Sequence, residues 1–242
     1  MTGEGKTASQ GVYPSRYETM VLLKDGSSML FRPIRVDDAA RWLAFIGRLS
    51  PRTKYLRFQH MPKEMGMEDA IRFCTIDYYN TFAIVAEVLR EMNTEIVGLG
   101  RYYRLPDQRL AQVDFAVEDA YQDKGIGTSL IHQLAMVGRE NGITSFEADV
   151  LAENEQMMSV FRSYGPHISS ELEAGVYRVT FPIARTSRVE KKEEERERAS
   201  TLASLRFLLK PRSVALIGAS RNLDTIGYLL LQCLTSSGFS GK

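Results

Sequence analysis

Cysteine is scarce in this chain of 242 residues, which holds only Cys74 and Cys233. Two cysteines so far apart provide neither a disulfide framework nor the close spacing of a zinc site. Long apolar runs are also lacking, since no stretch approaches the roughly 18 residues that a membrane-spanning helix needs. The polar start MTGEGKTASQG has no apolar region of the secretory type, and we expect residues 1–16 to be a disordered tail.

The chain also lacks an excess of charge of either sign. Its 31 Lys and Arg face 30 Asp and Glu, which leaves a formal net charge of +1 and no argument for binding nucleic acid or an anionic membrane. The residues present, 44% hydrophobic and 25% charged, are typical of a globular protein with a real core. We therefore expect a soluble cytoplasmic protein.

The first part of the chain predicts a hairpin followed by helices. The strand-like runs YETMVLL and SMLFRPI flank Lys24–Ser27, whose Asp-Gly pair predicts a β-hairpin turn. Asp37 precedes apolar residues at helical spacing and is expected to cap that helix. Ser50-Pro51 predicts another helix start, and a third helix is expected near residues 68–76.

The middle of the chain predicts a sheet. Three β-branched or aromatic runs separated by short loops indicate an antiparallel meander, at 81–89, 95–103 and 110–118. A helix, a strand, a helix and two strands follow, the first three at 128–140, 145–151 and 155–164. Together they predict an α/β (α+β) fold, in which a parallel β-α-β unit follows an antiparallel meander.

A glycine loop joins the meander to the next helix, where residues 121–130 read YQDKGIGTSL. Unpaired N–H groups at a helix start bind anions, and Gly125 and Gly127 let the backbone approach a phosphate. Gln122 and Lys124 can add hydrogen bonds, and Lys124 adds charge. No GKS or GKT follows, so it is not a Walker loop, and its spacing is too short for a dinucleotide fingerprint. Taken alone, the loop also fits a plain turn.

The segment from VDFAVEDAYQDKGIGTSL to VFRSYG resembles the Gcn5-related N-acetyltransferase (GNAT) superfamily. The resemblance lies in the strand before the loop, the loop Gln122–Thr128, its helix, the next strand, and Asn154 with its helix. With the upstream elements it covers residues 17–183. It implies the GNAT fold, a mixed and mostly antiparallel sheet with flanking helices, and an N-acetyltransferase that takes acetyl-CoA as its acyl donor.

The same resemblance implies the cofactor contacts. The backbone of Val117–Asp119 would bond the pantetheine arm like an added strand, and the amides of Lys124–Thr128 would hold the diphosphate. Asn154 would bond the pantetheine or orient the cofactor. The expected cofactor-binding residues are Val117, Asp119, Gln122, Lys124, Gly125, Ile126, Gly127, Thr128 and Asn154.

The position of the general base departs from the family pattern. Acyl transfer to an amine needs a neutral nucleophile, and many GNAT enzymes use a Glu on the strand before the loop. The position that aligns with it holds Gln112, which cannot take a proton. Asp114 lies two residues on, on the same face of the strand, and we predict it as the base. The alternative is a polar residue on a solvated face.

The position of the general acid also departs from the family pattern. Many GNAT enzymes have a Tyr in the helix after the Asn, and the matching residue here is Phe161. Tyr164, close to one helical turn further on, is the predicted substitute, and the alternative is an aromatic at the edge of the core. If neither acts, the CoA thiolate leaves unassisted, since a thiol of pKa about 8.5 is a fair leaving group. Arg57 either meets an acidic acceptor or lies in water.

A charged stretch, RTSRVEKKEEERER, predicts a helical linker over residues 184–204. Residues 205–242 resemble the beginning of the CoA-binding domain of NDP-forming acyl-CoA synthetases, on Pro211–Val214 and Gly218–Arg221. VALIGAS is expected to be a buried strand and DTIGYLLLQCLTSSGF the next helix, as the start of a domain that the sequence does not finish. The alternative is an end that is loosely packed or disordered.

This combination of domains resembles bacterial protein lysine acetyltransferases. It implies transfer to a protein lysine in a ternary complex, with an acyl-CoA synthetase as one such acceptor, on an analogy of domains rather than of site chemistry. Two alternatives stay open. One is a non-catalytic acyl-CoA sensor, which Gln112 and Phe161 favour, and the other is an acetyltransferase for a small amine. Neither a metal, nucleic acid nor a membrane is expected as a partner.

Overall fold

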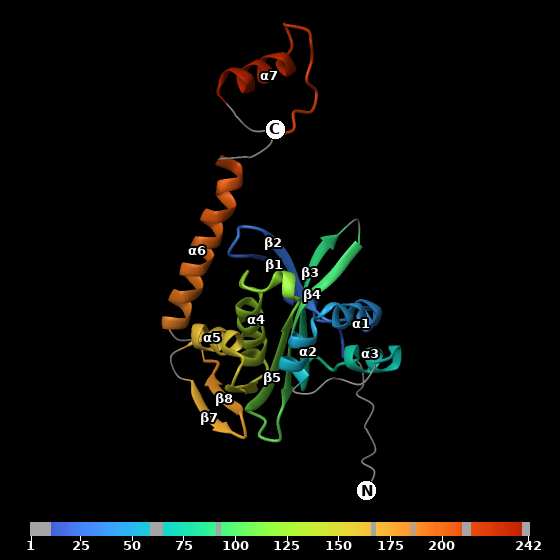
Figure 1. Cartoon of the computed structure of the whole chain (residues 1–242), viewed down its shortest axis with the longest axis vertical. Helices are drawn as coiled ribbons and strands as arrows, with labels where there is room; N and C mark the ends of the chain where they lie inside the picture. The colour runs from blue at the N-terminus through green and yellow to red at the C-terminus, as the bar shows by residue number, and fades with distance from the viewer. Residues whose placement is uncertain are drawn as a thin grey trace.

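The computed structural model describes residues 11–58, 65–90, 93–165, 168–184, 187–209 and 214–238. Within them, eight strands form one sheet in the order β1-β2-β3-β4-β5-β6-β8-β7 (Figure 1). The strands are β1 Thr19–Leu22, β2 Ser28–Pro33, β3 Thr81–Arg90, β4 Asn93–Arg104, β5 Leu110–Val117, β6 Ser145–Leu151, β7 Ser169–Glu173 and β8 Val176–Pro182. Neighbouring strands are antiparallel except β5 and β6, which confirms the predicted mixed sheet.

The described residues also form helices, most of which pack around this sheet. They are α1 Ala39–Arg48, α2 Pro51–Phe58, α3 Met67–Cys74, α4 Ile126–Glu140, α5 Glu155–Tyr164, α6 Ser187–Leu209 and α7 Ile226–Ser236, with the short 3₁₀ helices η1 Ser15–Tyr17, η2 Val36–Asp38 and η3 Asp119–Tyr121. Within the same residues, no helix is both long enough and apolar enough to cross a membrane.

Successive side chains of β4 point to opposite faces of the sheet, and each face is covered by a layer of helices. A Cβ on Gly98 would lie 2.9 Å from the Ile126 side chain, so glycine lets α4 pack closely on this face. On the opposite face, the Arg101 guanidinium lies 4.0 Å from the centroid of the Phe73 ring of α3. The sheet therefore lies between α4 with α5 on one face and α1, α2 and α3 on the other, and buried side chains fill both layers.

The parallel pair β5 and β6 stays together for only three residues, Leu110–Gln112 against Ser145–Glu147. Beyond them β5 continues to Val117 beside β4, and β6 continues to Leu151 beside β8. The two strands therefore separate on the side of the sheet where the glycine loop leaves β5. This separation creates the space for the site.

The start of α1 differs from the prediction. Asp37 does not cap it, because η2 forms first and α1 begins at Ala39. Asp38 takes the buried position instead, since its carboxylate accepts two hydrogen bonds from Arg32 at 2.7 Å and one from the Arg35 amide at 2.7 Å. Neither aspartate side chain caps α1, and the predicted cap at Asp37 is therefore wrong.

The two ends of the chain also differ from expectation. Of the predicted tail, residues 1–10 lie outside the described residues, but Gly11 donates its N–H to the Ile76 carbonyl at 3.1 Å and is bound to the domain. Helix α6 is found where a helical linker is predicted, and it continues to Leu209. The expected strand VALIGAS does not form, since residues 214–216 lack regular structure and Ile217 is 96% exposed.

A strand needs a neighbour to pair with, and none lies beside VALIGAS in the part of the chain that the structure describes. Helix α7 does form, capped by Thr225, whose hydroxyl accepts from the Tyr228 amide at 3.4 Å. In Figure 1 it lies beyond the end of α6, away from the sheet. Residues 210–213, which carry part of the synthetase resemblance, lie outside the described residues.

Candidate functional site

A cleft of about 1040 Å³ opens between the separated ends of β5 and β6. Helix α2, the glycine loop and α5 complete its walls. It brings together most of the predicted site residues, namely Asp114, Val117, Asp119, Gln122, Gly125, Ile126, Gly127, Thr128 and Asn154. Two predicted residues, Lys124 and Tyr164, do not line it.

The glycine loop has the geometry of an anion site. Gly125 has φ +90°, a conformation that favours glycine, and it caps α4. The first helical hydrogen bond runs from Ser129 N–H to the Gly125 carbonyl at 3.0 Å, so the amides of Ile126, Gly127 and Thr128 have no backbone acceptor. These amides stand at the positive end of the helix dipole, where phosphate binds favourably.

Among the described residues, the cations that line the cleft are Lys24, Arg52 and Arg57. Lys24 lies against Gly125 of this loop, and the sequence does not indicate it. Its side chain would lie 3.3 Å from a Cβ on Gly125. The Lys124 side chain does not line the cleft, and its ammonium lies 4.8 Å from the centroid of the Tyr121 ring in a cation–π contact. The prediction that the Lys124 side chain reaches the anion therefore needs correction, because its ammonium is engaged with the Tyr121 ring and Lys124 does not line the cleft.

Two polar residues of the loop are engaged within the protein. Gln122 donates from Nε2 to the Val117 carbonyl at 3.1 Å, rather than pointing a free amide at the anion site. Asp119 accepts from the Ser50 amide at 3.0 Å, the Ser50 hydroxyl at 2.7 Å and the Thr53 hydroxyl at 2.8 Å. Burial alone raises the pKa of Asp119, but these hydrogen bonds outweigh it and lower the pKa overall. Both residues therefore hold the loop in place.

Asn154 lines the cleft at the start of α5. Its Oδ1 accepts from the Met157 amide at 3.0 Å and so caps the helix. Its Nδ2 has no partner among the described residues and can donate into the cleft. Gln156 donates to Asp123 Oδ1 at 3.0 Å and links the start of α5 to the glycine loop.

At the other end of the cleft, Asp114 is paired with Arg57. The Asp114 Oδ1 and an Arg57 guanidinium nitrogen are 2.5 Å apart, with side chains 20% and 17% exposed. Arg57 therefore does not lie in water, as one of the two interpretations of the sequence had it, and its partner is a residue of the same chain. The pair places Asp114 against α2, and both residues line the cleft.

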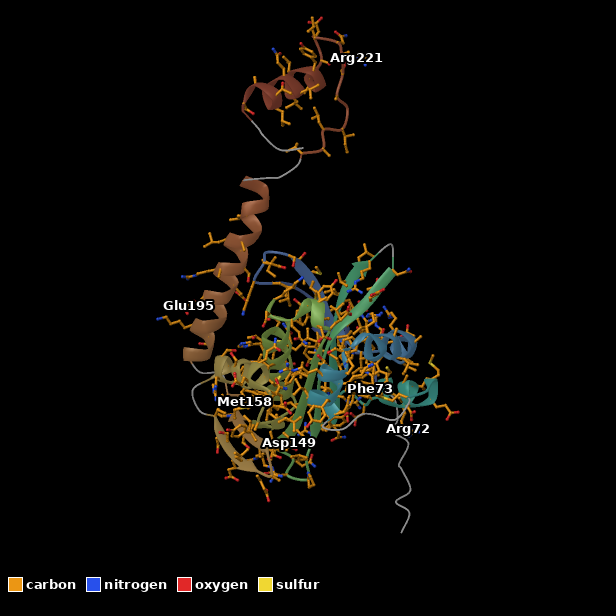
Figure 2. All side chains as sticks on the ribbon, in the orientation of Figure 1. Arg72, Phe73, Asp149, Met158, Glu195 and Arg221 are labelled. Carbon is orange, nitrogen blue, oxygen red and sulfur yellow. The ribbon has the colours of Figure 1, made fainter. Side chains whose placement is uncertain are left out.

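A second carboxylate at this end, Asp149, is absent from the residues predicted from the sequence. It lies on β6 and accepts from Gln112 Nε2 at 3.2 Å. Arg178 of β8 is 3.8 Å from its other oxygen. Asp149 is labelled in Figure 2, in the lower half of the view, where β5 and the last strands lie. The sequence does not reveal it, because only the register that pairs Gln112 with Glu147 brings residue 149 to the face of Gln112.

Tyr164 lies in the core, only 1% exposed. Its ring packs against His132, with centroids 5.0 Å apart, and against Phe181 at 5.4 Å. The physical reason is its place on the inner face of α5, one turn beyond Phe161, which is also buried. This position favours a core aromatic and corrects the expectation of a general acid in the cleft.

Comparisons with known proteins agree with this geometry. The family model described as the acetyltransferase (GNAT) family matches residues 52–165. Acetyltransferase PA5475 of Pseudomonas aeruginosa is 32% identical over 143 residues, which are 59% of this chain and 77% of that protein. The crystal structure of the GNAT domain of S. lividans PAT is 33% identical with a TM-score of 0.65, over 71% of this chain and 99% of that one. The chain belongs to the GNAT acetyltransferase family.

Acetyltransferase Pat of Mycolicibacterium smegmatis is a further relative, 28% identical over 146 residues. The match covers 60% of this chain but only 43% of Pat, so this chain spans less than half of that relative. GNAT acetyltransferases use acetyl-CoA, and this chain is accordingly an N-acetyltransferase with acetyl-CoA as its donor.

Proposed function

We propose that this GNAT enzyme transfers the acetyl group of acetyl-CoA to the side-chain amine of a protein lysine, with both substrates in the cleft at once. The observation that carries the proposal is the division of one cleft into two chemical ends. The glycine loop gathers backbone donors and Lys24 at one end. The separated strands gather the carboxylates of Asp114 and Asp149 at the other.

The cleft has the length and volume for two substrates. Asp114 and Val117 are three residues apart on an extended strand, which spans about 10 Å before the loop begins. An elongated donor such as acetyl-CoA suits this course. The volume of about 1040 Å³ is at the upper end of the range of ligand sites, and leaves room for an acceptor side chain beside the donor.

The residues at the loop end fit acetyl-CoA. We propose that the amides of Gly125–Thr128 hold the diphosphate, because they lack backbone acceptors and stand at the start of α4. Beyond Gln112 the edge of β5 is unpaired toward β6, so the backbone of Val117–Asp119 can bond the pantetheine arm. Asn154 Nδ2 can add a further donor. When bound, acetyl-CoA supplies the acetyl group.

The carboxylates supply the base and attract the acceptor. A lysine ammonium must lose a proton before it attacks, and Asp114 remains the proposed acceptor of that proton. Arg57 orients Asp114 through their ion pair, and leaves Oδ2 for the amine. Asp149 is the competing base, since it lines the same end of the cleft. With Tyr164 in the core, we propose that the thiolate leaves without a side-chain acid.

The acceptor and the domain plan remain parts of this proposal. The similarity to the GNAT domain of PAT and to acetyltransferase Pat supports a related acceptor, and the synthetase-like residues 205–242 support a protein one. We divide the chain into a GNAT domain at 17–183, a helical linker at 184–204 and a C-terminal segment. Membership in an enzyme family, with two carboxylates in the cleft, argues against a non-catalytic sensor.

The test is acetylation of defined acceptors. The full chain is incubated with acetyl-CoA and either a lysine-bearing protein, such as an acyl-CoA synthetase, or small amines at matched amine concentration. Release of CoA thiol is measured together with acetyl-lysine by mass spectrometry. We expect acetyl-lysine at defined positions of the protein acceptor. Turnover with small amines alone would exclude a protein acceptor, and acetyl-CoA binding without any turnover would support the sensor.

A further inference from the structure

The turn between β1 and β2 lies against the glycine loop, although about a hundred residues separate the two in sequence. The Lys24 amide donates to the Lys124 carbonyl at 3.2 Å and fixes the turn to the loop. Gly26, with φ +83°, closes the same turn. The hairpin is thus a wall of the loop end of the cleft rather than a separate edge of the sheet.

The Lys24 side chain follows this wall toward the start of α4. Its Cγ, Cε and Cδ lie 3.3, 3.4 and 3.6 Å from the position of a Cβ on Gly125. The absence of a side chain at Gly125 therefore lets the lysine stem lie along the loop. Lys24 lines the cleft, and the amides of Ile126, Gly127 and Thr128 follow directly after this contact.

The positive charge of Lys24 is not neutralised by an ion pair among the described residues. Among the described residues, no carboxylate lies within 4.0 Å of its ammonium. Asp25, the acidic residue of the same turn, accepts instead from the Ser27 amide at 3.0 Å and hydroxyl at 2.6 Å. Lys124, the other lysine nearby, has its ammonium on the Tyr121 ring.

We infer that the Lys24 ammonium binds the diphosphate of acetyl-CoA, so that the N-terminal hairpin completes the donor site. The inference rests on the proposed placement of acetyl-CoA at the α4 loop. Backbone amides supply direction, and Lys24 supplies the full positive charge that the loop itself does not bring into the cleft. The assignment also explains why the hairpin turn is hydrogen-bonded to the loop.

The test compares three variants that each remove one positive charge, Lys24→Met, Lys124→Met and Lys191→Met. Methionine keeps an unbranched stem over Gly125, and Lys191 is an exposed residue of α6 outside the cleft. Calorimetry measures the Kd for acetyl-CoA at low and high salt. We expect Lys24→Met to raise the Kd about five- to ten-fold at low salt, with a smaller effect at high salt and little change for Lys191→Met.

Analogues of acetyl-CoA that lack one phosphate group or the diphosphate identify which phosphate Lys24 contacts. The effect of Lys24→Met should persist with 3′-dephospho-acetyl-CoA and vanish with acetyl-pantetheine, which lacks the diphosphate. Loss of the effect with the dephospho form would move the contact to the 3′-phosphate and overturn the assignment. A larger effect from Lys124→Met would overturn it too. If Gly127→Val weakens binding while Lys24→Met leaves the Kd unchanged, only this inference fails, and if neither variant weakens binding, the proposed donor site fails as well.

Discussion

The two ends of the cleft present different chemical groups, backbone amides at one end and side-chain carboxylates at the other. The loop end is mainly backbone, with Gly125 in a left-handed conformation and three amides left open by the start of α4. The acceptor end is built from side chains already bound to partners, Asp114 with Arg57 and Asp149 with Gln112. The first end can hold an anion without rearrangement, and the second must share its carboxylates with an incoming amine.

This difference separates binding from transfer. Amides at a helix start are positioned by the fold, so binding at the loop depends little on neighbouring side chains. A paired carboxylate depends on its partner, because the guanidinium both orients it and competes for its oxygens. Variants at one end should therefore change the Kd for acetyl-CoA, and variants at the other should change the rate of transfer.

The largest effect is expected at the acceptor end. Asp114→Asn keeps the size of the side chain but removes its ability to take a proton. We expect kcat/KM for the lysine acceptor to fall about 100- to 1000-fold, as for the loss of a general base, with the Kd for acetyl-CoA unchanged. Steady-state kinetics and calorimetry on the same preparation measure the two quantities.

Asp149→Asn is the matched variant, since it also removes one carboxylate from this end of the cleft. Asp149→Asn should lower kcat/KM for the lysine acceptor less than Asp114→Asn does if Asp114 is the base. The reverse order would assign the base to Asp149 on the neighbouring strand. A weaker Kd for acetyl-CoA in either variant would show that the two ends are not separate.

The next effect is expected at the loop. A Cβ on Gly127 would meet only Val160 at 3.7 Å, an ordinary contact, so the fold itself tolerates a side chain there. Gly127→Val should nevertheless raise the Kd for acetyl-CoA about 100-fold, because a branched side chain would keep the diphosphate from about two amides. The melting temperature without ligand should change little.

Gly127→Ala serves as the graded control and should weaken binding less than Gly127→Val. Equal binding by wild type and both variants would place the donor away from this loop. A fall in melting temperature that matches the fall in affinity would instead attribute the effect to the fold.

The sequence predicts the loop end well because its signals are local. Strand β6 and helix α5 match their predicted bounds to the residue, since the local pattern of apolar and polar residues marks them within a few positions. The spacing of Gly125 and Gly127 likewise predicts, from neighbouring residues alone, that the backbone can approach a phosphate closely. Elements whose boundaries are set by nearby residues can be predicted from a single sequence.

The features that the sequence does not predict depend on contacts between segments that are distant in the chain. No pattern near Lys24 indicates that its turn lies on a loop a hundred residues away, and none near Asp149 indicates Gln112 as its partner. VALIGAS has the composition of a strand, but pairing with a neighbour decides whether it becomes one. Helical spacing places Tyr164 correctly on α5 but does not indicate that this face of the helix is buried.

A smaller effect should follow from Asp119→Asn, because Asp119 ties the loop to the start of α2. Its pKa is lowered in the folded state, so its contribution to stability is present above the unfolded pKa of about 4 and is lost as pH falls through the folded pKa. We expect the variant to be about 1 kcal/mol less stable at pH 7 and equal to wild type near pH 2. Urea unfolding at both pH values measures this difference, and a difference that persists at low pH would contradict it.

The smallest effect on catalysis is expected from Tyr164→Phe. The ring is 1% exposed and packs on His132 and Phe181, so its phenol is part of the core rather than of the acceptor end. Removing the hydroxyl should leave kcat with a lysine acceptor within about two-fold, well below the 100-fold that loss of a general acid can cost. Any change should appear in the melting temperature instead. A fall in kcat of ten-fold or more with an unchanged melting temperature would return Tyr164 to the catalytic residues, and would mean that α5 moves when the donor binds.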